Sequence, residues 1–462
     1  MRVSMTASDR RDVVRNRSAI LDATISLLDD GETPTAGAVA WRAGVARATV
    51  YRHYPTIAAL VTEAEETRAS QVRPPAADAP SPAPLDIPAL LDRVAPPQLP
   101  EQIVGEAQRY SRARAVALYL VDIGGTRLLR AAGSLEFPEE MVVRLAAGPE
   151  IPAEGVEALH EAVSATLPSV TIAPMVVRGR ATGALLALDA QDAGLLQEMA
   201  RHAGIALAMS EPFSDVIAAS RRRKETTAAA ETQQLCLPPR LARLSGLRLA
   251  GDVLPAYENG GNWFDHAENQ DGAWIAAVDT LGSGARAAAT SAVALGALRA
   301  ARTVGSTPRD AIQHMDAAIR GIGGDEVRCS AFVARWHATT STLFWVAAGD
   351  LHPVLADAEG RLTTLRDHAL PQLATDPLPE TIPTSHRVVR PDERILLLSD
   401  GVSGLGGAPL SAAALRELAR RSRGASPART LSLIQGAIRD AAGEDLDDDA
   451  MIVVLAPAKG VS

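Results

Sequence analysis

A proline-rich stretch constrains the fold of this chain more than any other feature. Residues 72–100 hold nine of the 30 prolines, too many for a continuous helix or a central strand, because proline lacks a backbone donor. The stretch predicts a linker over 71–100 that contains at most one short helix. We therefore expect the 462 residues to divide into separate domains, about three at roughly 150 residues each.

The residues after the linker predict a small α/β domain over 101–211. Two pairs of apolar runs, each pair separated by a glycine-containing turn, predict two β-hairpins. A helix then closes the domain, and a second helix leads into the last domain. These elements are expected at 115–122, 127–132, 170–177, 181–188, 192–209 and 214–234, the last within a linker helix over 212–235.

The last part of the chain, 236–458, predicts an α/β sandwich. Short apolar strands lie far apart in the sequence with helices between them, an order that is typical of sheets covered by helices. Pro308 and Pro427 each suit the first turn of a helix, where no amide donor is needed. The expected strands are 274–278, 343–347, 394–399 and 451–455, and the expected helices are 285–302, 308–321, 411–421 and 427–441.

Charge and composition bear on location and partners. The formal net charge is −9, yet residues 1–54 carry eight arginines against six acidic residues. A locally basic module suits DNA, because only the docking face must neutralise phosphates. Cys236 and Cys329 lack the spacing of a zinc site or a disulfide framework. The chain also lacks a membrane-length apolar run and a signal-peptide core, so we expect a cytoplasmic protein with no membrane partner.

The first domain, 1–70, has the pattern of an all-α helix-turn-helix. Helical spacing at 15–28 is followed by short helices at 35–43 and 47–54, and Gly44 permits the turn between them. The segment VAWRAGVARATVYRHYPTIAAL resembles the N-terminal DNA-binding module of the TetR family. The resemblance implies that the DNA-binding residues are Arg47, Thr49, Tyr51, Arg52, His53 and Tyr54.

Two departures from that family bear on affinity for DNA. Ala46 stands where a serine usually caps the recognition helix, so a capping bond worth roughly 1 kcal/mol is missing. Residues 56–58 lack the lysine that usually meets a phosphate. We expect a homodimer on a two-fold symmetric double-stranded DNA operator. The alternative is a three-helix bundle that serves only for dimer contacts.

The middle domain resembles a GAF domain, a small sensory and dimerising α/β module. The resemblance rests on the two hairpins, the closing helix and the segment IAPMVVRGRATGALLAL. It implies a small-molecule effector and a homodimer contact. His202, on the closing helix, has two interpretations: a haem ligand, or a structural residue, which a lone helix histidine more often is.

Carboxylates at strand ends indicate phosphoester chemistry in the last domain. Two-metal hydrolysis needs several carboxylates around two divalent cations about 4 Å apart. Such carboxylates end or border apolar runs here, so the sheets would gather them at one edge. The candidates are Asp265, Asp279, Asp400, Asp448 and Asp449.

The motifs in this region resemble, in order, those of the SpoIIE-type branch of the PPM serine/threonine phosphatases. They read GGNWFD, VDTLGSGARAAA, WVAAGDLHPVL, LLLSDGV and DDDAMIVVL. The resemblance implies two Mn or Mg ions and a phosphoprotein substrate of the anti-anti-sigma kind. It makes Asp279 the bridging ligand beside the carbonyl of Thr280, with Asp400 and Asp448 at the second metal. Asp279 and Asp400 are then the catalytic residues, and Asp265 is a further metal ligand.

Three departures fall on the chemistry. Asn262 stands where the family has a metal-site Asp; its amide oxygen can coordinate a cation but brings no charge. Ser283 and Asp350 replace histidines, which removes candidate protonating groups. Two functions stay open. One is a metal-dependent protein phosphatase with GAF input and DNA targeting. The other is a transcription factor whose phosphatase-like domain is catalytically degenerate and serves in signalling or dimerisation.

Overall fold

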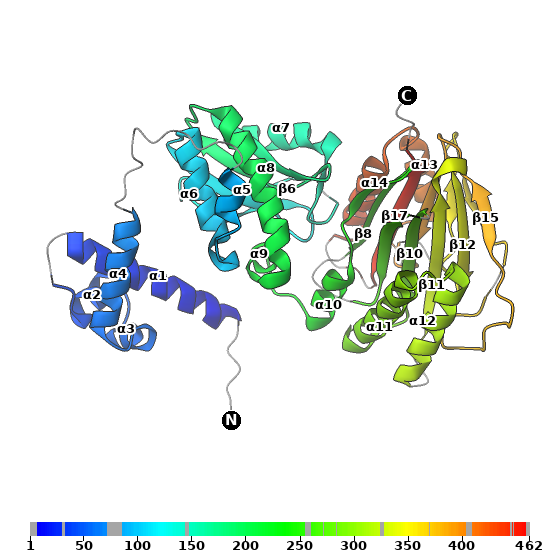
Figure 1. Cartoon of the computed structure of the whole chain (residues 1–462), viewed down its shortest axis with the longest axis horizontal. Coiled ribbons are helices and arrows are strands. Elements are labelled where there is room, and N and C mark those ends of the chain that lie inside the picture. Colours follow the sequence, from blue (N-terminus) through cyan, green and yellow to red (C-terminus); the bar gives the residue numbers. More distant parts are fainter. Residues whose placement is uncertain are drawn as a thin grey trace. The chain divides into compact units, whose positions relative to one another are not determined.

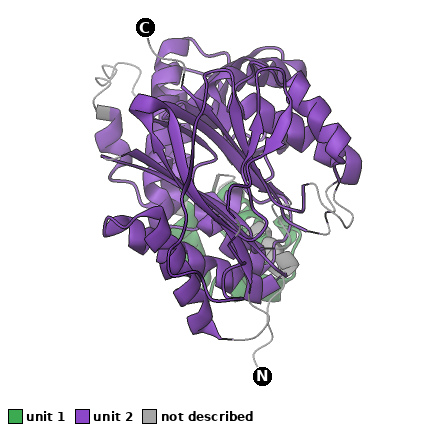
Figure 2. Cartoon of the chain, turned by 90° about the vertical axis from the view of Figure 1, so that its right-hand side faces the viewer, with its two compact units in different colours: residues 1–81 green, residues 82–462 purple. Residues whose placement is uncertain are grey.

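The computed structural model describes residues 7–29, 33–71, 86–143, 147–254, 260–270, 272–282, 284–323, 328–368, 370–402, 409–443, 446 and 448–458. The chain forms two compact units, residues 1–81 and 82–462 (Figure 2). Among the helices described, none combines the length and the apolar character that a membrane crossing requires.

Four helices build the first unit: α1 (Ala7–Asp29), α2 (Ala36–Arg42), α3 (Arg47–His53) and α4 (Ile57–Gln71). Thr35 caps α2 by accepting a hydrogen bond from the Ala38 amide. Gly44, with a φ of +66°, turns the chain into α3, a conformation that glycine adopts without strain. The apolar helix faces meet in a core that includes Ile20, Val39 and Leu60.

The predicted linker extends too far toward the C-terminus. Helix α5 (Asp86–Leu91), a 3-10 turn (Pro96–Gln98) and the start of α6 (Leu99–Ser111) occupy its second half. Ile87, Leu91 and Leu99 are buried in the core of the middle domain. Apolar residues between the prolines therefore anchor this part of the chain, whereas residues 72–85 lie outside the described part.

A six-stranded antiparallel sheet forms the middle domain, with β3, β2, β1, β6 and β4 in order and β5 also paired with β6. Alternate residues of β1 face opposite sides: Val116 and Leu118 pack with α5, α6 and α8, while Ala117 and Tyr119 pack with α7. The bounds are β1 Ala115–Val121, β2 Arg127–Gly133, β3 Glu140–Val142, β4 Ile151–Pro152, β5 Val170–Val177, β6 Arg180–Leu188, α7 Val156–Thr166 and α8 Ala193–Ser210, with a 3-10 turn at Ala153–Gly155.

The prediction of one linker helix over 212–235 is wrong. A 3-10 turn (Glu211–Phe213), α9 (Val216–Ser220) and α10 (Ala228–Cys236) are separate elements. The break lies where Arg221 is buried and its guanidinium reaches the carbonyls of Val121 and Thr182. Thr227 then begins α10 by accepting from the Ala230 amide. The structure therefore has two short helices, α9 and α10, where the sequence predicted one.

The last part of the chain is a four-layered α/β sandwich, as its sequence predicts. One sheet has the order β15-β12-β11-β10-β9 and the other β14-β13-β16-β17-β8-β7. In β17, Met451 and Val453 face the core between the sheets, whereas Ile452 and Val454 face α13 and α14. Helices α11 and α12 cover the other sheet (Figure 1). Both faces of β17 are buried, which explains its continuous apolar run.

The predicted strands and helices of the sandwich all appear, within a few residues of their expected ends. Seven further strands in the described part of the sandwich were not predicted, because they are short or carry polar residues. The bounds are β7 Leu241–Leu244, β8 Leu247–Leu254, β9 Trp263–Asn269, β10 Gly272–Thr280, β11 Cys329–His337, β12 Thr342–Ala348, β13 Val354–Ala356, β14 Leu362–Thr364, β15 Ser385–Val388, β16 Arg394–Leu398, β17 Ala450–Pro457, α11 Gly284–Thr303, α12 Pro308–Ile322, α13 Ala412–Arg421 and α14 Pro427–Ala442, with a 3-10 turn at Ala338–Thr340.

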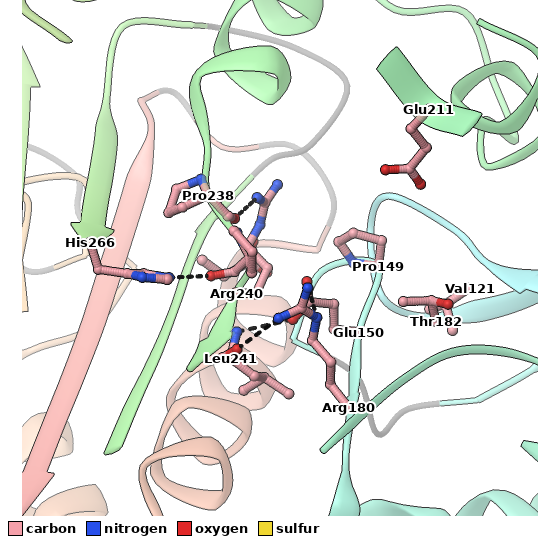
Figure 3. A network of polar contacts seen from close by, with 12 residues as sticks. Val121, Pro149, Glu150, Arg180, Thr182, Glu211, Pro238, Arg240, Leu241 and His266 are labelled. Atoms are coloured by element: carbon pink, nitrogen blue, oxygen red, sulfur yellow. Dashed lines mark hydrogen bonds and ion pairs between the residues drawn. The ribbon is translucent and has the colours of Figure 1, made fainter. Parts of the chain in front are cut away.

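The middle domain and the sandwich are joined by a buried polar junction (Figure 3). Glu150 of the middle domain accepts a hydrogen bond from the Leu241 amide at 3.0 Å and pairs with Arg180 at 3.2 Å. On the sandwich side, Arg240 pairs with Asp252 at 3.2 Å. Buried charges need such partners, because an unpaired buried charge is strongly unfavourable.

Candidate active site

Three acidic residues converge where strands of the two sheets end. Asp279 is the penultimate residue of β10, Asp400 follows β16, and Asp448 precedes β17. The Asp400 amide donates a hydrogen bond to a carboxylate oxygen of Asp279 over 3.4 Å. Antiparallel pairing of β16 with β17 brings the end of one strand to the start of the other. The structure therefore brings together three of the four predicted acidic ligands, which we call the aspartate cluster.

The aspartate cluster is electrostatically strained. Burial, and then the negative charges of Asp400 and Asp448, raise the pKa of Asp279 to about 7. Burial also raises the pKa of Asp448, with a smaller contribution from Asp400. Like charges that face one another in a partly buried place disfavour ionisation. The cluster would gain stability from a cation between its members.

The donor chemistry of the cluster fits a hard divalent cation. Carboxylate oxygens are the ligands that Mg²⁺ and Mn²⁺ prefer. Within the described segments, however, no three His, Cys, Asp or Glu side chains already lie together in an arrangement that could hold a metal ion. The cluster thus supplies the right atoms, and its side chains would have to draw closer around an ion.

Asn262, the residue that departs from the family pattern, is buried and fully hydrogen-bonded. Its side-chain oxygen accepts from the Thr280 amide at 2.9 Å, and its side-chain nitrogen donates to the Asp449 carbonyl at 3.2 Å. Its own amide donates to the Asp449 carboxylate at 3.2 Å. Asn262 therefore ties the end of β10 to the start of β17.

Thr280, expected to offer its carbonyl to the metal, is the last residue of β10 and is buried. Its hydroxyl lies 2.8 Å from the Ser291 hydroxyl on α11. Together with the amide contact to Asn262, this holds the end of β10 against the neighbouring helix. Ser283, the other departure in this loop, lies outside the described residues.

Asp265 does not join the aspartate cluster, which corrects the prediction that it binds metal. Asp265 on β9 lies opposite Ala276 on β10, so these two side chains share one face of the sheet. Ala276 lies three positions before Asp279 along β10. An odd spacing along a strand places two side chains on opposite faces of the sheet. The Asp265 carboxylate instead pairs with Arg299 at 3.1 Å and with Arg302 at 2.9 Å, both on α11.

Two buried polar residues, Gln233 and Asp449, lie beside the aspartate cluster. The Gln233 side chain, on α10, donates to the Asp449 carboxylate at 2.5 Å and to the Asn262 carbonyl at 2.9 Å. Burial raises the pKa of Asp449 to about 7. Asp449 was among the candidate carboxylates, but no local pattern marks Gln233, because its contact spans 216 residues of sequence. Asp350, which replaces a family histidine, follows β12, and its amide donates to the Ser330 hydroxyl at 3.1 Å.

Five of the six predicted DNA-contacting residues lie on α3, and the sixth, Tyr54, directly follows this helix. Arg47, Tyr51 and Arg52 are exposed, and Thr49 and His53 are partly exposed. Tyr54 is only 3% exposed; its hydroxyl donates to Glu63 at 3.1 Å and accepts from Arg17 at 3.3 Å. Tyr54 is thus a core residue of the first unit, which corrects its predicted place at the DNA. Ala46 precedes α3 without a side-chain cap, as the sequence indicates.

The geometry of the aspartate cluster agrees with a comparison of sequences. Residues 269–457 match the family model of stage II sporulation protein E (SpoIIE). The match covers less than half of the chain and contains Asp279, Asp400 and Asp448. Residues 269–457 are thus similar to SpoIIE, and they lie within the α/β sandwich. The family match does not reach the first unit or the middle domain, so their TetR-type and GAF assignments stay predictions.

Solved structures offer more distant similarities. The PP2C domain of SiaA from Pseudomonas aeruginosa is 18% identical with a TM-score of 0.42, over 50% of this chain and 94% of that one. The RsbU and RsbW domains of a Mycobacterium tuberculosis protein are 22% identical with a TM-score of 0.40, over 47% and 65%. The phosphatase domain of Bacillus subtilis SpoIIE with a regulatory fragment is 13% identical with a TM-score of 0.38, over 46% and 65%. No curated protein matches the chain.

Proposed function

We propose that the SpoIIE-type domain is a metal-dependent protein serine/threonine phosphatase that acts through the aspartate cluster. The convergence of Asp279, Asp400 and Asp448 from three strand ends carries this proposal, because phosphoester hydrolysis of this kind needs grouped carboxylates. These three side chains would hold Mn²⁺ or Mg²⁺, with the Thr280 carbonyl beside them. A bound divalent cation would supply Lewis-acid chemistry toward a phosphate ester.

Residues around the cluster hold its members in place. The Ser399 hydroxyl donates to the Asp449 carbonyl at 2.8 Å and accepts from the Met451 amide at 2.9 Å. The Asp449 amide in turn donates to the Asp448 carboxylate at 2.7 Å. These contacts tie Asp400 and Asp448 to adjacent strands, and such a rigid supporting shell keeps ligands near a productive geometry.

A hydrolysis assay tests the phosphatase. The full chain in excess Mn²⁺ should release p-nitrophenol from p-nitrophenyl phosphate, and Asp279→Ala should lower the rate by at least about 100-fold, the scale of losing one electrostatic group. Asp367→Ala, at an exposed carboxylate of the same domain, should keep the full rate. If the parent chain releases p-nitrophenol no faster than Asp279→Ala, the proposed phosphatase activity is contradicted.

The second candidate function is a phosphatase-like domain without turnover, used in signalling or dimerisation. Asn262 favours it, because this amide replaces a charged ligand and both of its side-chain polar atoms already have hydrogen-bond partners within the fold. The same assay separates the two functions. Activity that appears only after Asn262→Asp would show that the site of this chain is degenerate.

For the first unit, our proposal is sequence-specific binding of a double-stranded DNA operator through α3. Arg47, Tyr51 and Arg52 are exposed on the helix that follows the Gly44 turn, while Val50 packs into the core. This is the division of faces that a recognition helix needs. The middle domain would sense a small-molecule effector and support a homodimer, and the phosphatase substrate would be a phosphoprotein of the anti-anti-sigma kind.

A titration of the full chain against the DNA upstream of its own gene tests the proposed DNA binding. Arg47→Ala with Arg52→Ala should weaken binding about tenfold or more, and should flatten the slope of log affinity against log salt by roughly two phosphate contacts. Arg416→Ala, at an exposed arginine of α13, should change neither quantity. Equal binding by the double variant and the parent chain would contradict α3 as the DNA contact.

A further inference from the structure

Figure 1 shows α11 and α12 over one sheet of the sandwich. A row of cationic and aromatic side chains crosses this sheet. Trp274 on β10 lies opposite Arg335 on β11, Arg335 opposite Phe344 on β12, and Phe344 opposite His386 on β15. Directly opposite residues of neighbouring strands share one face. The row lies toward the start of β10, whereas the aspartate cluster lies at its end.

The side chains of this row contact one another. The Arg335 guanidinium carbon lies 5.7 Å from the centre of the Trp274 ring, within the range of a cation–π interaction. The rings of Phe344 and His386 stack with centres 5.8 Å apart and planes 24° apart. Phe344 is nevertheless 39% exposed. The row is thus preformed and still presents an aromatic surface to solvent.

A groove of about 730 Å³ runs along the row and is bounded by the first turn of α12. Arg309, in that turn, donates to the Thr384 hydroxyl at 2.5 Å, which holds it beside the strands. We call this place the ladder groove; Arg309, Arg335, Phe344 and His386 define it. Its volume is in the range of pockets that bind ligands of moderate size.

The ladder groove is electropositive on a chain of net charge −9. Arg309, Arg335, His337 and His386 line it, and Asp310 is the acidic residue among its lining residues. The Asp310 carboxylate is engaged, because it accepts from the amide and the hydroxyl of Thr307 at 2.8 Å each.

We propose that the ladder groove docks an extended acidic segment of a partner protein. Carboxylates of the segment would meet Arg309 and Arg335, and an apolar side chain would cover Phe344. This proposal is independent of the phosphatase activity and of DNA binding. It adds a recognition surface on the far side of the domain from the aspartate cluster.

Two observations favour a peptide over a nucleotide. The two arginines of the groove come from different elements, α12 and β11, whereas a nucleotide phosphate is cradled by donors at one point. β15 also ends the order of strands in its sheet as described, pairing with β12 alone. The open edge of a strand can accept the backbone of an extended peptide.

Fluorescence anisotropy on the full chain tests the groove, with a labelled peptide of alternating glutamate and phenylalanine as the probe. Arg309→Glu and, separately, Phe344→Ala should each weaken binding about tenfold or more, because each removes a complementary contact. Both side chains are exposed, so the variants should melt at the parent temperature. The matched control Arg416→Glu on α13 should bind like the parent.

Three results would overturn the proposal. One is equal binding of a probe in which lysine replaces glutamate, and another is unchanged affinity in both groove variants. The third is displacement of the peptide by ADP at comparable concentration, which would make the groove a nucleotide site. Hydrolysis of p-nitrophenyl phosphate by Phe344→Ala should equal that of the parent chain, so failure of the groove and failure of the phosphatase are distinguishable.

Discussion

At the scale of single residues, Asn262 shows how one substitution changes the use of a site. An aspartate there would bring charge to a cation, whereas the amide of Asn262 both accepts and donates within the fold. Its nitrogen satisfies the buried carbonyl of Asp449, which a carboxylate cannot do. The residue thus stabilises the junction of β10 and β17 without a metal.

Asn262→Asp should make the domain depend on metal for stability. In buffer with chelator the variant should lose about 1–3 kcal/mol, the scale of breaking a buried hydrogen bond, and excess Mn²⁺ should raise its melting temperature more than that of the parent. Asn269→Asp, at an exposed position of β9, the strand that begins directly after Asn262, is the matched control. A melting curve of Asn262→Asp that does not respond to Mn²⁺ would contradict this account.

At the scale of elements, α3 is a short helix that lacks a side chain at its start to hold its first amides. Ala46 precedes it with an extended backbone and forms no side-chain cap. By contrast, a Ser or Thr side chain caps α2, α10, α12, α13 and α14. Unsatisfied amides at a helix start are exposed to solvent competition. Helix α3 is therefore open to stabilisation by a capping side chain.

Ala46→Ser should stabilise the first unit by about 1 kcal/mol, because serine accepts from an amide of the first turn. Thermal unfolding of the full chain, followed by a probe attached to the first unit, measures this. Ala48→Ser, inside α3 and exposed, makes the same chemical change without a cap and should not stabilise. Equal shifts in both variants would remove capping as the cause.

At the scale of the whole molecule, the polar junction of Figure 3 couples the middle domain to the sandwich. Burial raises the pKa of Glu150, although Arg180 and Arg240 oppose the shift. A group whose pKa is raised on folding stabilises the fold below its unfolded pKa, and this stability is lost as the pH rises through its folded pKa. The junction should therefore weaken from about pH 4.5 upward.

Glu150→Gln should remove this pH dependence, because glutamine keeps an acceptor for the Leu241 amide but does not ionise. Melting temperatures should be measured over a series of pH values. The melting temperature of the variant should rise relative to that of the parent chain as the pH rises. Parallel curves for the two proteins would contradict the role of Glu150. Glu157→Gln, at an exposed position of α7 in the same domain, is the control and should follow the parent at every pH.

Much of the fold could be predicted because the signals are local. Apolar runs such as β17, first-turn prolines in α12 and α14, and the Gly44 turn act through neighbouring residues alone. The boundaries of the linker and of α9 and α10 could not be predicted from local signals. They depend on the burial of Ile87, Leu91 and Arg221, which comes from contacts with distant parts of the chain. Tyr54 was misplaced for the same reason, since its hydrogen bonds to Arg17 and Glu63 come from α1 and α4.

The sequence itself determined three features: the proline-rich segment between domains, the alternation of strands and helices, and the acidic residues at strand ends. Each of them depends only on residue type and short spacing. Which carboxylates meet was decided by the tertiary structure. Strand register sends Asp279 to the aspartate cluster and Asp265 to the arginines of α11, and the position of α10 brings Gln233 to Asp449. A sequence pattern can indicate a candidate carboxylate. The face of the sheet on which that carboxylate lies, however, follows from pairing with strands far along the chain.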